Sequence, residues 1–482
     1  MTQVIMFQGT GSGVGKSIIA AGFCRLLANR GIKVAPFKAQ NMALNSGVTM
    51  DGLEMGRAQF LQAEAARIAP DVRMNPILLK PQGNHRSQLV RLGKVVGTYR
   101  AQEYYQLAEE NFEIVKSAFD SLLRDFDVVI IEGAGSPAEI NLQRTDIVNM
   151  RMADYAQASV FIIGDIDRGG VFAWLKGTYD LIQDTYKPLI KGFIINKFRG
   201  DYSLLAPGIE LFASMVPVKT VGTLPYMKIT LEDEDSQNIS SQIDENARIK
   251  IGVIRLPYIS NFTDFSPLKM LDDVSLHFVE KASELDEFDI IVLPGSKDTL
   301  NDLMFLKETG FFEKLQDLFG QKLMIGICGG FQMMGRSIAD PDGMESSLPE
   351  MEALNFIEMK TVIGKEKILN NQKYQGKGLL EGIVCAGYEI HMGTSLIDDP
   401  GLEQIVEKPD TFIWKQSKRL LGTYIHGLFD SLELTQRILH LFDDSFEVRN
   451  DFFEEKEKQL NALAASLEKH CDLNVILQDQ TK

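Results

Sequence analysis

Short apolar runs alternate with longer amphipathic stretches through the first half of the chain. Parallel strands that are joined by helices are buried on both faces, so their sequences are short, continuous apolar runs. The pattern predicts strands at residues 4–8, 33–37, 127–132, 159–165 and 190–196. It predicts helices at residues 17–29, 57–68, 102–123, 145–156 and 204–214. This alternation indicates βαβ crossovers and therefore an open α/β domain with a parallel sheet.

The pattern changes at residues 231–248, which read LEDEDSQNISSQIDENAR. This stretch is acidic and lacks apolar periodicity, as is typical of a solvated linker. A second α/β series follows, in KIGVIRL, DIIVLPGS and KLMIGICGG, and ends near GTYIHGLFD. We therefore expect one domain at 1–230, a linker at 231–248 and a second domain at 249–450. The charged, helical segment 451–482 is expected to pack on the second domain.

Composition limits the class of protein. A chain of 482 residues is long enough for two or more cores. Its 45% hydrophobic and 24% charged residues are an ordinary globular mixture, which excludes collagen and long disorder. The net charge of −16 argues against a nucleic-acid partner, because phosphate binding needs a surplus of Lys and Arg. An anionic substrate must therefore meet local basic residues.

The cysteines and the apolar runs bear on the cellular compartment. Four cysteines lie far apart without a CxxC pair, so neither a zinc site nor a disulfide framework is indicated. The opening apolar run is too short for a signal peptide, and no uninterrupted apolar stretch approaches the ~20 residues of a membrane span. We expect a cytoplasmic protein without a membrane partner.

Residues 9–17, GTGSGVGKS, stand between the first predicted strand and the first predicted helix. In such a loop the backbone N–H groups and the positive helix end hold phosphate oxygens, a lysine adds charge and a Ser hydroxyl can bind Mg²⁺. Thr10 replaces the first glycine of the usual pattern. A glycine turn capped by the serine is the structural alternative, but the strand and helix on either side favour ATP binding. The candidate ligands are Thr10, Gly13, Gly15, Lys16 and Ser17.

Polar side chains follow the later strands of this domain. Glu132 ends a buried strand, where open α/β sheets bind ligands, and is a candidate Mg²⁺ partner. Lys38 ends the second strand and could hold a substrate carboxylate or a transferred phosphoryl group, although a solvated lysine is the alternative. Asn196 could pair with the edge of adenine or form an ordinary turn. Residues 164–170, GDIDRGG, could serve metal, substrate or structure.

Cys328 lies in GICGGFQ, between an apolar strand and a stretch with helical pattern. Glycines on both sides allow a sharp elbow, and a helix N-terminus favours the thiolate. A buried, inert thiol is the commoner role of a single cysteine. His426, in YIHGLF, is the expected base for a nucleophilic Cys328, and His391 is the second choice. Residues 293–298 could supply backbone donors for an oxyanion.

These motifs carry a resemblance to known families. The second domain resembles the class I, triad-type glutamine amidotransferases, and the first resembles the dethiobiotin synthetase-like ATP-dependent ligases. The whole chain resembles the cobyric acid synthase family, in family order, through GTGSGVGKS, FKAQNMALNS, EMGRAQ, NPILLKP, EGAGSPAEINL, DIDRGGVFA, INKFRGD, LPGSKDT, GICGGFQMMG, GYEIHMG and YIHGLFD.

The resemblance implies a reaction. Members of this family amidate the b, d, e and g carboxylates of adenosylcobyrinic acid a,c-diamide, on the route to cobalamin, and use ATP, Mg²⁺ and L-glutamine. It implies that Cys328 and His426 release ammonia from glutamine. In the first domain ATP would phosphorylate a corrinoid carboxylate, and ammonia would displace the phosphate. The supporting residues would be Lys16, Ser17, Glu132 and Lys38.

The chain departs from the expected motifs at a few positions. A triad-type amidotransferase has Glu two residues after its histidine, but this chain has Leu428 there. The site is then a Cys and His pair, or it recruits a carboxylate from elsewhere, for which Glu389 is a candidate. Ala39 stands where Pro is expected, and Gly13 stands where Asp is common.

Three other functions compete with this interpretation. The least favoured is a two-domain metabolite-binding protein, against which Lys16 and Cys328 argue. Cobyrinic acid a,c-diamide synthase shares the domain order and the chemistry, but the elbow at Cys328 and the FKAQNM and DIDRGGVFA segments favour the cobyric acid enzymes. From another class, a phosphate-loop ATPase switch could carry an inactive amidotransferase-like binding domain. The presence of both Cys328 and His426 argues against a decayed site.

Overall fold

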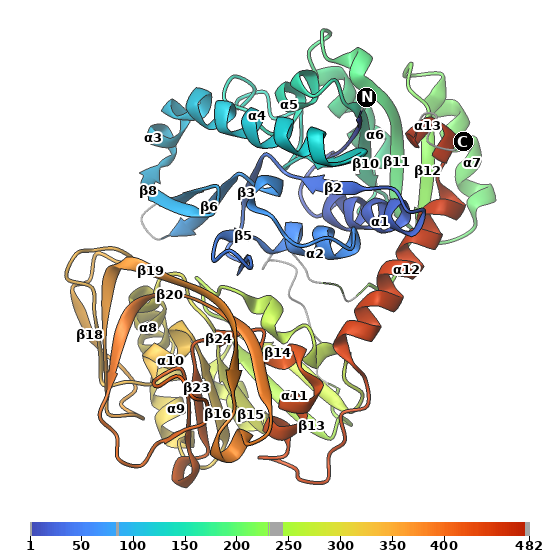
Figure 1. Cartoon of the computed structure of the whole chain (residues 1–482). Coiled ribbons are helices and arrows are strands. Elements are labelled where there is room, and N and C mark those ends of the chain that lie inside the picture. The colour runs from blue at the N-terminus through green and yellow to red at the C-terminus, as the bar shows by residue number, and fades with distance from the viewer. Residues whose placement is uncertain (1, 83–85, 230, 232–243, 478–482) are drawn as a thin grey trace.

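The computed structural model describes residues 2–82, 86–229, 231 and 244–477. Two α/β bodies lie one above the other in Figure 1. Most of the predicted linker, residues 232–243, lies outside the described residues.

A six-stranded parallel sheet forms the centre of the first domain, in the order β12-β11-β10-β1-β9-β2. Its strands are β1 (Gln3–Gly9), β2 (Val34–Phe37), β9 (Val128–Glu132), β10 (Ser159–Asp165), β11 (Ile190–Phe198) and β12 (Thr220–Pro225). The apolar runs predicted as strands form the first five, because each is buried on both faces. The α/β class of the first domain is confirmed.

Helices cover both faces of this sheet. Alternate residues of β1 face opposite ways, so Ile5 and Phe7 join one apolar cluster and Met6 joins the other. The first cluster is completed by α1 (Lys16–Asn29), α2 (Arg57–Ala65), α12 (Phe452–His470) and α13 (Leu473–Leu477). The second is completed by α4 (Ala108–Asp125), α5 (Met150–Tyr155), α6 (Val171–Leu181) and α7 (Tyr202–Ala213).

A smaller sheet inserted between α1 and α4 was not predicted from the sequence. It has the order β3-β6-β7-β8, and its strands are β3 (Gln40–Met42), β6 (Ile77–Gln82), β7 (Arg86–Arg91) and β8 (Lys94–Arg100). A two-stranded ribbon, β4 (Ser46–Val48) with β5 (Glu54–Gly56), lies beside it. Strands β3, β4 and β5 have three residues each, and β8 is exposed or half-buried, so these strands carry no long buried apolar run. The sequence analysis did not recognise the buried run 77–79 of β6 as a strand. The predicted helix at 102–123 is divided at Leu107 into α3 (Ala101–Gln106) and α4.

The second domain contains a seven-stranded sheet in the order β14-β13-β15-β16-β23-β22-β21. Its strands are β13 (Ile249–Ile254), β14 (Val274–Val279), β15 (Ile290–Leu293), β16 (Leu323–Ile327), β21 (Glu403–Gln404), β22 (Phe412–Lys415) and β23 (Leu420–Thr423). The helices of this part are α8 (Thr299–Glu308), α9 (Phe311–Leu318), α10 (Gly329–Met333) and α11 (Leu432–Leu439). The adjacent strands β14, β13, β15, β16 and β23 of this sheet are parallel to one another. This confirms the α/β class of the second domain also.

A second sheet of this domain, β18-β17-β19-β20-β24, carries a long ribbon toward the first domain (Figure 1). Its strands are β17 (Ser337–Ala339), β18 (Glu350–Glu352), β19 (Met359–Gln375), β20 (Val384–Ile397) and β24 (Ile425–His426). The β19 side chains Lys367 and Asn371 reach Glu54 and the Val48 carbonyl of the first domain. The ribbon therefore joins the two domains.

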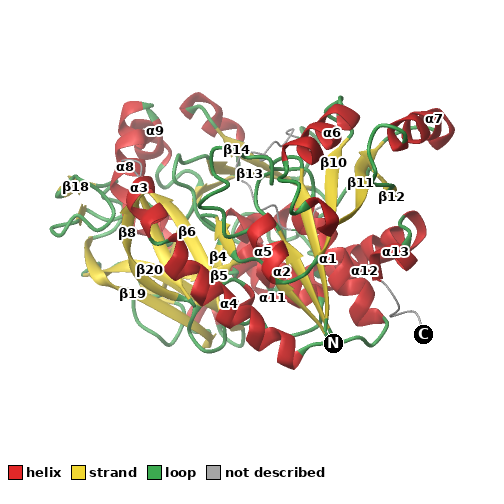
Figure 2. Cartoon of the chain, turned by 90° about the horizontal axis from the view of Figure 1, so that it is seen from above, coloured by secondary structure: helices red, strands yellow, loops and turns green. Residues whose placement is uncertain are grey.

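The expectation that the C-terminal segment packs on the second domain is wrong. Helix α12 leaves the second domain and lies beside α1 of the first, as Figures 1 and 2 both show. Its buried residues Leu463 and Leu467 pack against Gly22 of α1. Arg25 of α1, itself buried, pairs with Glu457 of α12. The amphipathic pattern predicted a helix correctly, but it carries no information on which surface the apolar face covers.

Candidate active sites

The glycine-rich loop follows β1 directly and leads into α1. Gly15 has φ +100°, and a Cβ there would lie 2.3 Å from Asn196 Nδ2, so a side chain would be both strained and obstructed. Asn196, at the end of β11, donates to the Val14 carbonyl at 2.9 Å. Lys197 donates to the Gly13 carbonyl at 2.8 Å. The end of β11 thus holds the loop in shape.

Lys16 lies at the start of α1 and is buried. Its Nζ donates to the carbonyls of Gly11 at 2.8 Å and Gly135 at 3.2 Å. The ammonium group is therefore held between the glycine loop and the loop after β9, at the helix N-terminus where an anion is favoured. Thr10 begins the loop, and its backbone N–H donates to Ile163 of β10.

Glu132 is the centre of a buried polar cluster at the end of β9. Its Oε1 accepts from Ser17 Oγ at 2.8 Å and from Lys38 Nζ at 2.9 Å. Its Oε2 accepts from Gln62 Nε2 at 2.5 Å and lies 3.5 Å from Gln59 Nε2. The structure thus brings together three residues predicted from separate parts of the sequence, because the carboxyl ends of parallel strands meet at one edge of a sheet.

The donor set at this cluster fits Mg²⁺. Proteins commonly bind Mg²⁺ through one or two carboxylates and substrate phosphates, with water completing the shell. Ser17 and Glu132 supply a hydroxyl and a carboxylate, both beside the glycine loop. Among the residues that the structure describes, no group of three or more acidic, His or Cys side chains is placed to hold a metal ion by itself.

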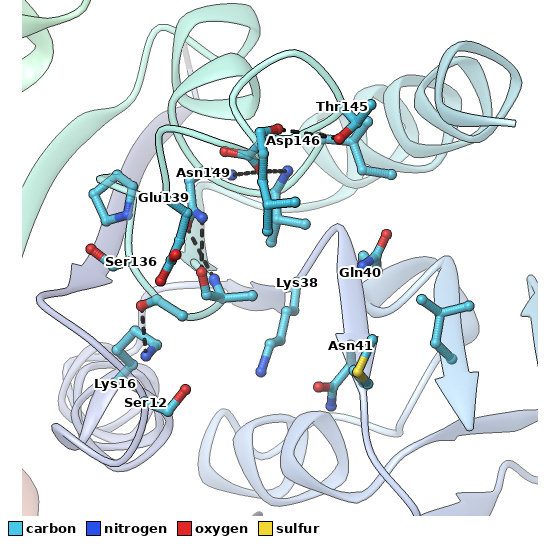
Figure 3. Close-up of a pocket in the computed structure, with 18 of the residues that line it drawn as sticks. Ser12, Lys16, Lys38, Gln40, Asn41, Ser136, Glu139, Thr145, Asp146 and Asn149 are labelled. Atoms are coloured by element: carbon cyan, nitrogen blue, oxygen red, sulfur yellow. Dashed lines mark hydrogen bonds between the residues drawn. The ribbon is translucent and has the colours of Figure 1, made fainter. Parts of the chain in front are cut away.

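A cavity of about 800 Å³ opens over this cluster. In Figure 3, Lys38 points into it between Ser12 and Lys16 on one side and Gln40 and Asn41 on the other. The remaining wall comes from the loop 134–149 and from residues of the inserted sheet and α3, including Met42, Leu79, Tyr99, Tyr104 and Tyr105. The cavity has the size of a site for a cofactor or a large ligand.

The charged side chains of residues 164–170 form ion pairs. Asp165 pairs with Lys197 at 2.8 Å and lies 3.6 Å from Arg168. Asp167 pairs with Arg199 at 3.0 Å. Of the roles left open by the sequence, these contacts favour the structural one.

Cys328 forms the elbow between β16 and α10. Its backbone has φ 52° and ψ −109°, which is rare for a residue other than glycine and marks stored strain. A Cβ on Gly330 would lie 2.0 Å from the Leu293 carbonyl oxygen, so the elbow packs directly on the 293–296 turn. Cys328 Sγ lies 3.6 Å from the Ile390 carbonyl oxygen. The thiol is therefore held at the first turn of α10, in the wall of a small cavity.

His426 lies on β24 and is fully buried. Its Nδ1 is 2.6 Å from Asp264 Oδ2, and the other oxygen of Asp264 accepts from the Gly427 N–H at 3.1 Å. Burial disfavours the charged ring, but the charge and hydrogen bond of Asp264, with a further contribution from Cys328, outweigh it and raise the pKa of His426 to about 10. The carboxylate thus orients the ring and favours its protonated form.

Asp264 was missed by the sequence analysis. It lies in η4 (Phe262–Phe265), 162 residues before His426, so no local spacing links the two. The available signal was an acidic residue in the loop that follows β13, at the ligand-binding edge of the sheet. The candidate Glu389 is held instead by Tyr374 at 2.5 Å and by Lys408 at 2.7 Å.

Other predicted residues also lie around Cys328. His391 lines the same small cavity and stacks on Tyr424, with ring centroids 3.9 Å apart. The turn at 293–298 is adjacent, since a Cβ on Gly295 would lie 3.2 Å from His426 Cε1. Ser296 and Lys297 of this turn line the cavity as well.

Comparison with known proteins identifies the families of both domains. Residues 5–239 match the CobQ/CobB/MinD/ParA nucleotide binding domain, and residues 250–434 match the CobB/CobQ-like glutamine amidotransferase domain. The chain is 41% identical to the cobyric acid synthase of Clostridium novyi, over 98% of this chain and 97% of that one. It is 43% identical to the cobyric acid synthase of Yersinia enterocolitica, over 99% and 98% of the two chains. The chain belongs to the cobyric acid synthase family.

Membership of the cobyric acid synthase family decides between the alternatives left by the sequence. A member is a glutamine-dependent amide ligase of cobalamin biosynthesis, which favours this function over an a,c-diamide synthase or an ATPase switch. The relative from Clostridium kluyveri is 45% identical over 90% of this chain. The described helices were also compared with the requirements of a membrane span, and none has both the length and the apolar character for one.

The domain limits at 230 and 249 stay a prediction.

Proposed function

We propose that this chain amidates the b, d, e and g carboxylates of adenosylcobyrinic acid a,c-diamide with ATP and L-glutamine. The observation that supports the proposal is a pair of buried polar clusters in one family member. They are the Ser17–Glu132–Lys38 cluster at the glycine-rich loop and the His426–Asp264 pair beside Cys328. We expect the reaction to take place in the cytoplasm, without a nucleic-acid or membrane partner.

Glutamine hydrolysis is assigned to the second domain. The Cys328 thiolate attacks the side-chain amide carbon of glutamine and forms a tetrahedral adduct, whose oxyanion is stabilised by backbone N–H groups of the 293–298 turn and of α10. Protonated His426 gives its proton to the leaving nitrogen, so ammonia departs and a glutamyl thioester remains. Water, with His426 now acting as base, cleaves the thioester to glutamate and restores the thiol. Asp264 keeps the ring oriented throughout.

Carboxylate activation is assigned to the first domain. A corrinoid carboxylate oxygen attacks the γ-phosphorus of ATP, the bond to ADP breaks, and an acyl phosphate forms. Ammonia then attacks the acyl carbon, and inorganic phosphate and a proton leave. Lys16 and Lys38 line the same cavity, which supports a role for both in neutralising charge on the transferred phosphoryl group. Thr10, Gly13 and Gly15 shape the loop that would hold the phosphates.

Mg²⁺ would be held by Ser17 and Glu132, and when bound it would neutralise charge on the phosphates of ATP. Asn196 already uses its amide on the Val14 carbonyl, which supports a role in shaping the loop. Its proposed contact with adenine would have to use the remaining polar groups of the side chain.

Mass spectrometry tests the proposal. The purified chain is incubated with adenosylcobyrinic acid a,c-diamide, ATP, Mg²⁺ and either glutamine or ammonium chloride, beside Cys328→Ala and the control Cys385→Ala. We expect four successive carboxyl-to-amide mass shifts in the wild type. Cys328→Ala should lose them with glutamine and keep them with ammonia, whereas Cys385→Ala should keep both. ATP hydrolysis without any mass shift would refute the corrinoid substrate.

A further inference from the structure

Two buried asparagines exchange hydrogen bonds across the domain boundary. Asn45 Oδ1 of the first domain accepts from the Phe262 N–H of the second at 3.1 Å. In return, Asn261 Oδ1 accepts from the Ser46 N–H at 3.0 Å. Both side chains are almost fully buried, at 1% and 2% exposed. We call this reciprocal contact of Asn45, Ser46, Asn261 and Phe262 the asparagine clasp.

On the second domain the clasp adjoins the carboxylate that holds His426. Asn261 takes the left-handed conformation, φ 52°, immediately before η4. Its carbonyl accepts from the Asp264 N–H at 2.9 Å. Asp264 in turn lies 2.6 Å from His426 Nδ1. The clasp therefore fixes the start of the short helix whose third residue orients the histidine beside Cys328.

In the first domain, the clasp residues closely follow a strand that lines the large cavity. Gln40, Asn41 and Met42 of β3 line that cavity. After β3 the chain is still hydrogen-bonded to β6, because the Ala43 N–H donates to the Leu79 carbonyl at 3.1 Å. Asn45 follows two residues later. One continuous segment, residues 40–46, thus runs from the cavity that contains Lys16 and Lys38 to the clasp.

Asn45 takes part in this contact through its oxygen. Within the described ranges, its buried Nδ2 has no hydrogen-bond partner. A buried N–H group without a partner costs free energy. The amide nitrogen of Asn45 therefore does not explain why a polar side chain is found at this position. The contact with the Phe262 N–H is the interaction that accounts for a polar side chain at this position.

We propose that Asn45 and Asn261 are positioning residues that couple occupancy of the phosphate-loop cavity to the alignment of the Cys328–His426–Asp264 site. The inference rests on the proposed function. A ligand that orders residues 40–46 favours the arrangement in which Asn45 holds the start of η4, and so favours glutamine hydrolysis when ATP and the corrinoid are bound. If the aligned site also binds glutamine more tightly, linkage requires bound glutamine to raise the affinity of the first domain for its ligands by the same factor.

The test compares glutamate release without and with saturating ATP and adenosylcobyrinic acid a,c-diamide, beside amidation driven by ammonia. We expect ATP and the corrinoid to stimulate the wild type at least about fivefold, the lower end of usual coupling. Asn45→Ala should lose the stimulation and keep ammonia-driven amidation. Asn261→Gly, which permits the same backbone conformation without the amide oxygen, should also lose it.

Two further variants separate coupling from structure. Asn371→Ala removes another hydrogen bond between the domains, from Asn371 Nδ2 to the Val48 carbonyl at 2.6 Å, and should keep the stimulation. Asn45→Asp retains an acceptor oxygen and should restore it. The inference is overturned if the wild type is not stimulated, if Asn45→Ala remains stimulated, or if Asn371→Ala loses stimulation equally. A wild type that fails to amidate with ammonia would instead contradict the proposed function.

Discussion

Leu79 and Lys80 are neighbours on β6, yet they line different cavities. Leu79 lies in the wall of the large cavity above Lys16 and Lys38, whereas Lys80 lies in the wall of the small cavity that contains Cys328. Successive side chains of a strand point to opposite faces, so this one strand borders both sites. In the proposed reaction, the place where ammonia is released and the place where it is consumed are therefore separated by the layer to which β6 belongs.

A buried ion cluster that includes Lys80 lies at the boundary between the two domains. Glu54 accepts from Lys80 Nζ at 2.9 Å and from Lys367 Nζ of the second domain at 2.5 Å. Burial raises the pKa of Glu54, but the charges of both lysines outweigh it and hold the pKa well below its usual value. Glu54→Gln would leave two buried ammonium groups without their carboxylate, so we expect a loss of about 3–5 kcal/mol in stability.

Urea unfolding followed by circular dichroism measures this loss. Glu109→Gln is the matched control, because Glu109 pairs with Arg151 at the surface, where water screens the charges. The control should shift the midpoint much less than Glu54→Gln. Equal shifts would mean that the buried cluster does not stabilise the boundary.

Local patterns predicted those parts of the sites that are local in the sequence. Lys16 and Ser17 follow a strand and a glycine loop directly, and Cys328 lies between glycines, so each is recognisable from its neighbours. Glu132 and Lys38 were predicted separately, and the parallel sheet brings their charged groups to 2.9 Å. Strand ends carry this information because they share one edge of the sheet.

Contacts between distant segments could not be predicted in this way. Asp264 approaches His426 only after β13 and β24 have been placed, and its own neighbours in sequence carry no motif. The same holds for Asn45, which contacts the second domain from a loop of the first. The pattern of α12 predicted a helix but not the surface that it covers. Such information resides in the tertiary arrangement and not in periodicity.

Asp264→Asn should impair glutamine-dependent amidation. The amide would keep the size of the side chain but remove the charge that holds His426 in its orientation and protonated form. We expect a fall of about 10²- to 10⁴-fold in kcat with glutamine, the usual range for loss of acid–base catalysis. Amidation with ammonia should not change. Glu389→Gln tests the alternative carboxylate, and a larger loss in that variant than in Asp264→Asn would contradict the assignment.

The raised pKa of His426 also predicts a pH dependence of stability. The folded pKa of about 10 exceeds the ordinary value of 6.5, so protonation stabilises the fold fully below pH 6.5, and this contribution disappears as the pH rises through about 10. The difference in Tm between the wild type and Asp264→Asn should therefore be larger at pH 6.5 than at pH 10. A difference that stays constant across this range would show that Asp264 does not act through the charge of the histidine.

Lys38→Met should impair the ligase reaction with either nitrogen donor. The variant removes the ammonium group that lies in the cavity wall 2.9 Å from Glu132, and with it one source of charge neutralisation for phosphoryl transfer. We expect about a 10²-fold fall in kcat for ATP-dependent amidation with ammonia, comparable to the loss of one preorganised donor. Lys191→Met, at an exposed position of β11, is the control. Unchanged amidation in Lys38→Met would place this lysine outside the reaction.

Leu467→Ala should destabilise the first domain although it lies near the C-terminus. Leu467 is fully buried against α1, and its Cδ1 would lie 2.4 Å from a Cβ on Gly22, so the two helices are in close contact there. The truncation removes buried methyl groups and leaves a cavity, which costs about 2–5 kcal/mol. Thermal unfolding should show a clearly lowered Tm, whereas Leu204→Ala, at a position that is 83% exposed, should leave Tm nearly unchanged. If both variants kept the wild-type Tm, the contact of α12 with α1 would add little to the stability of the first domain.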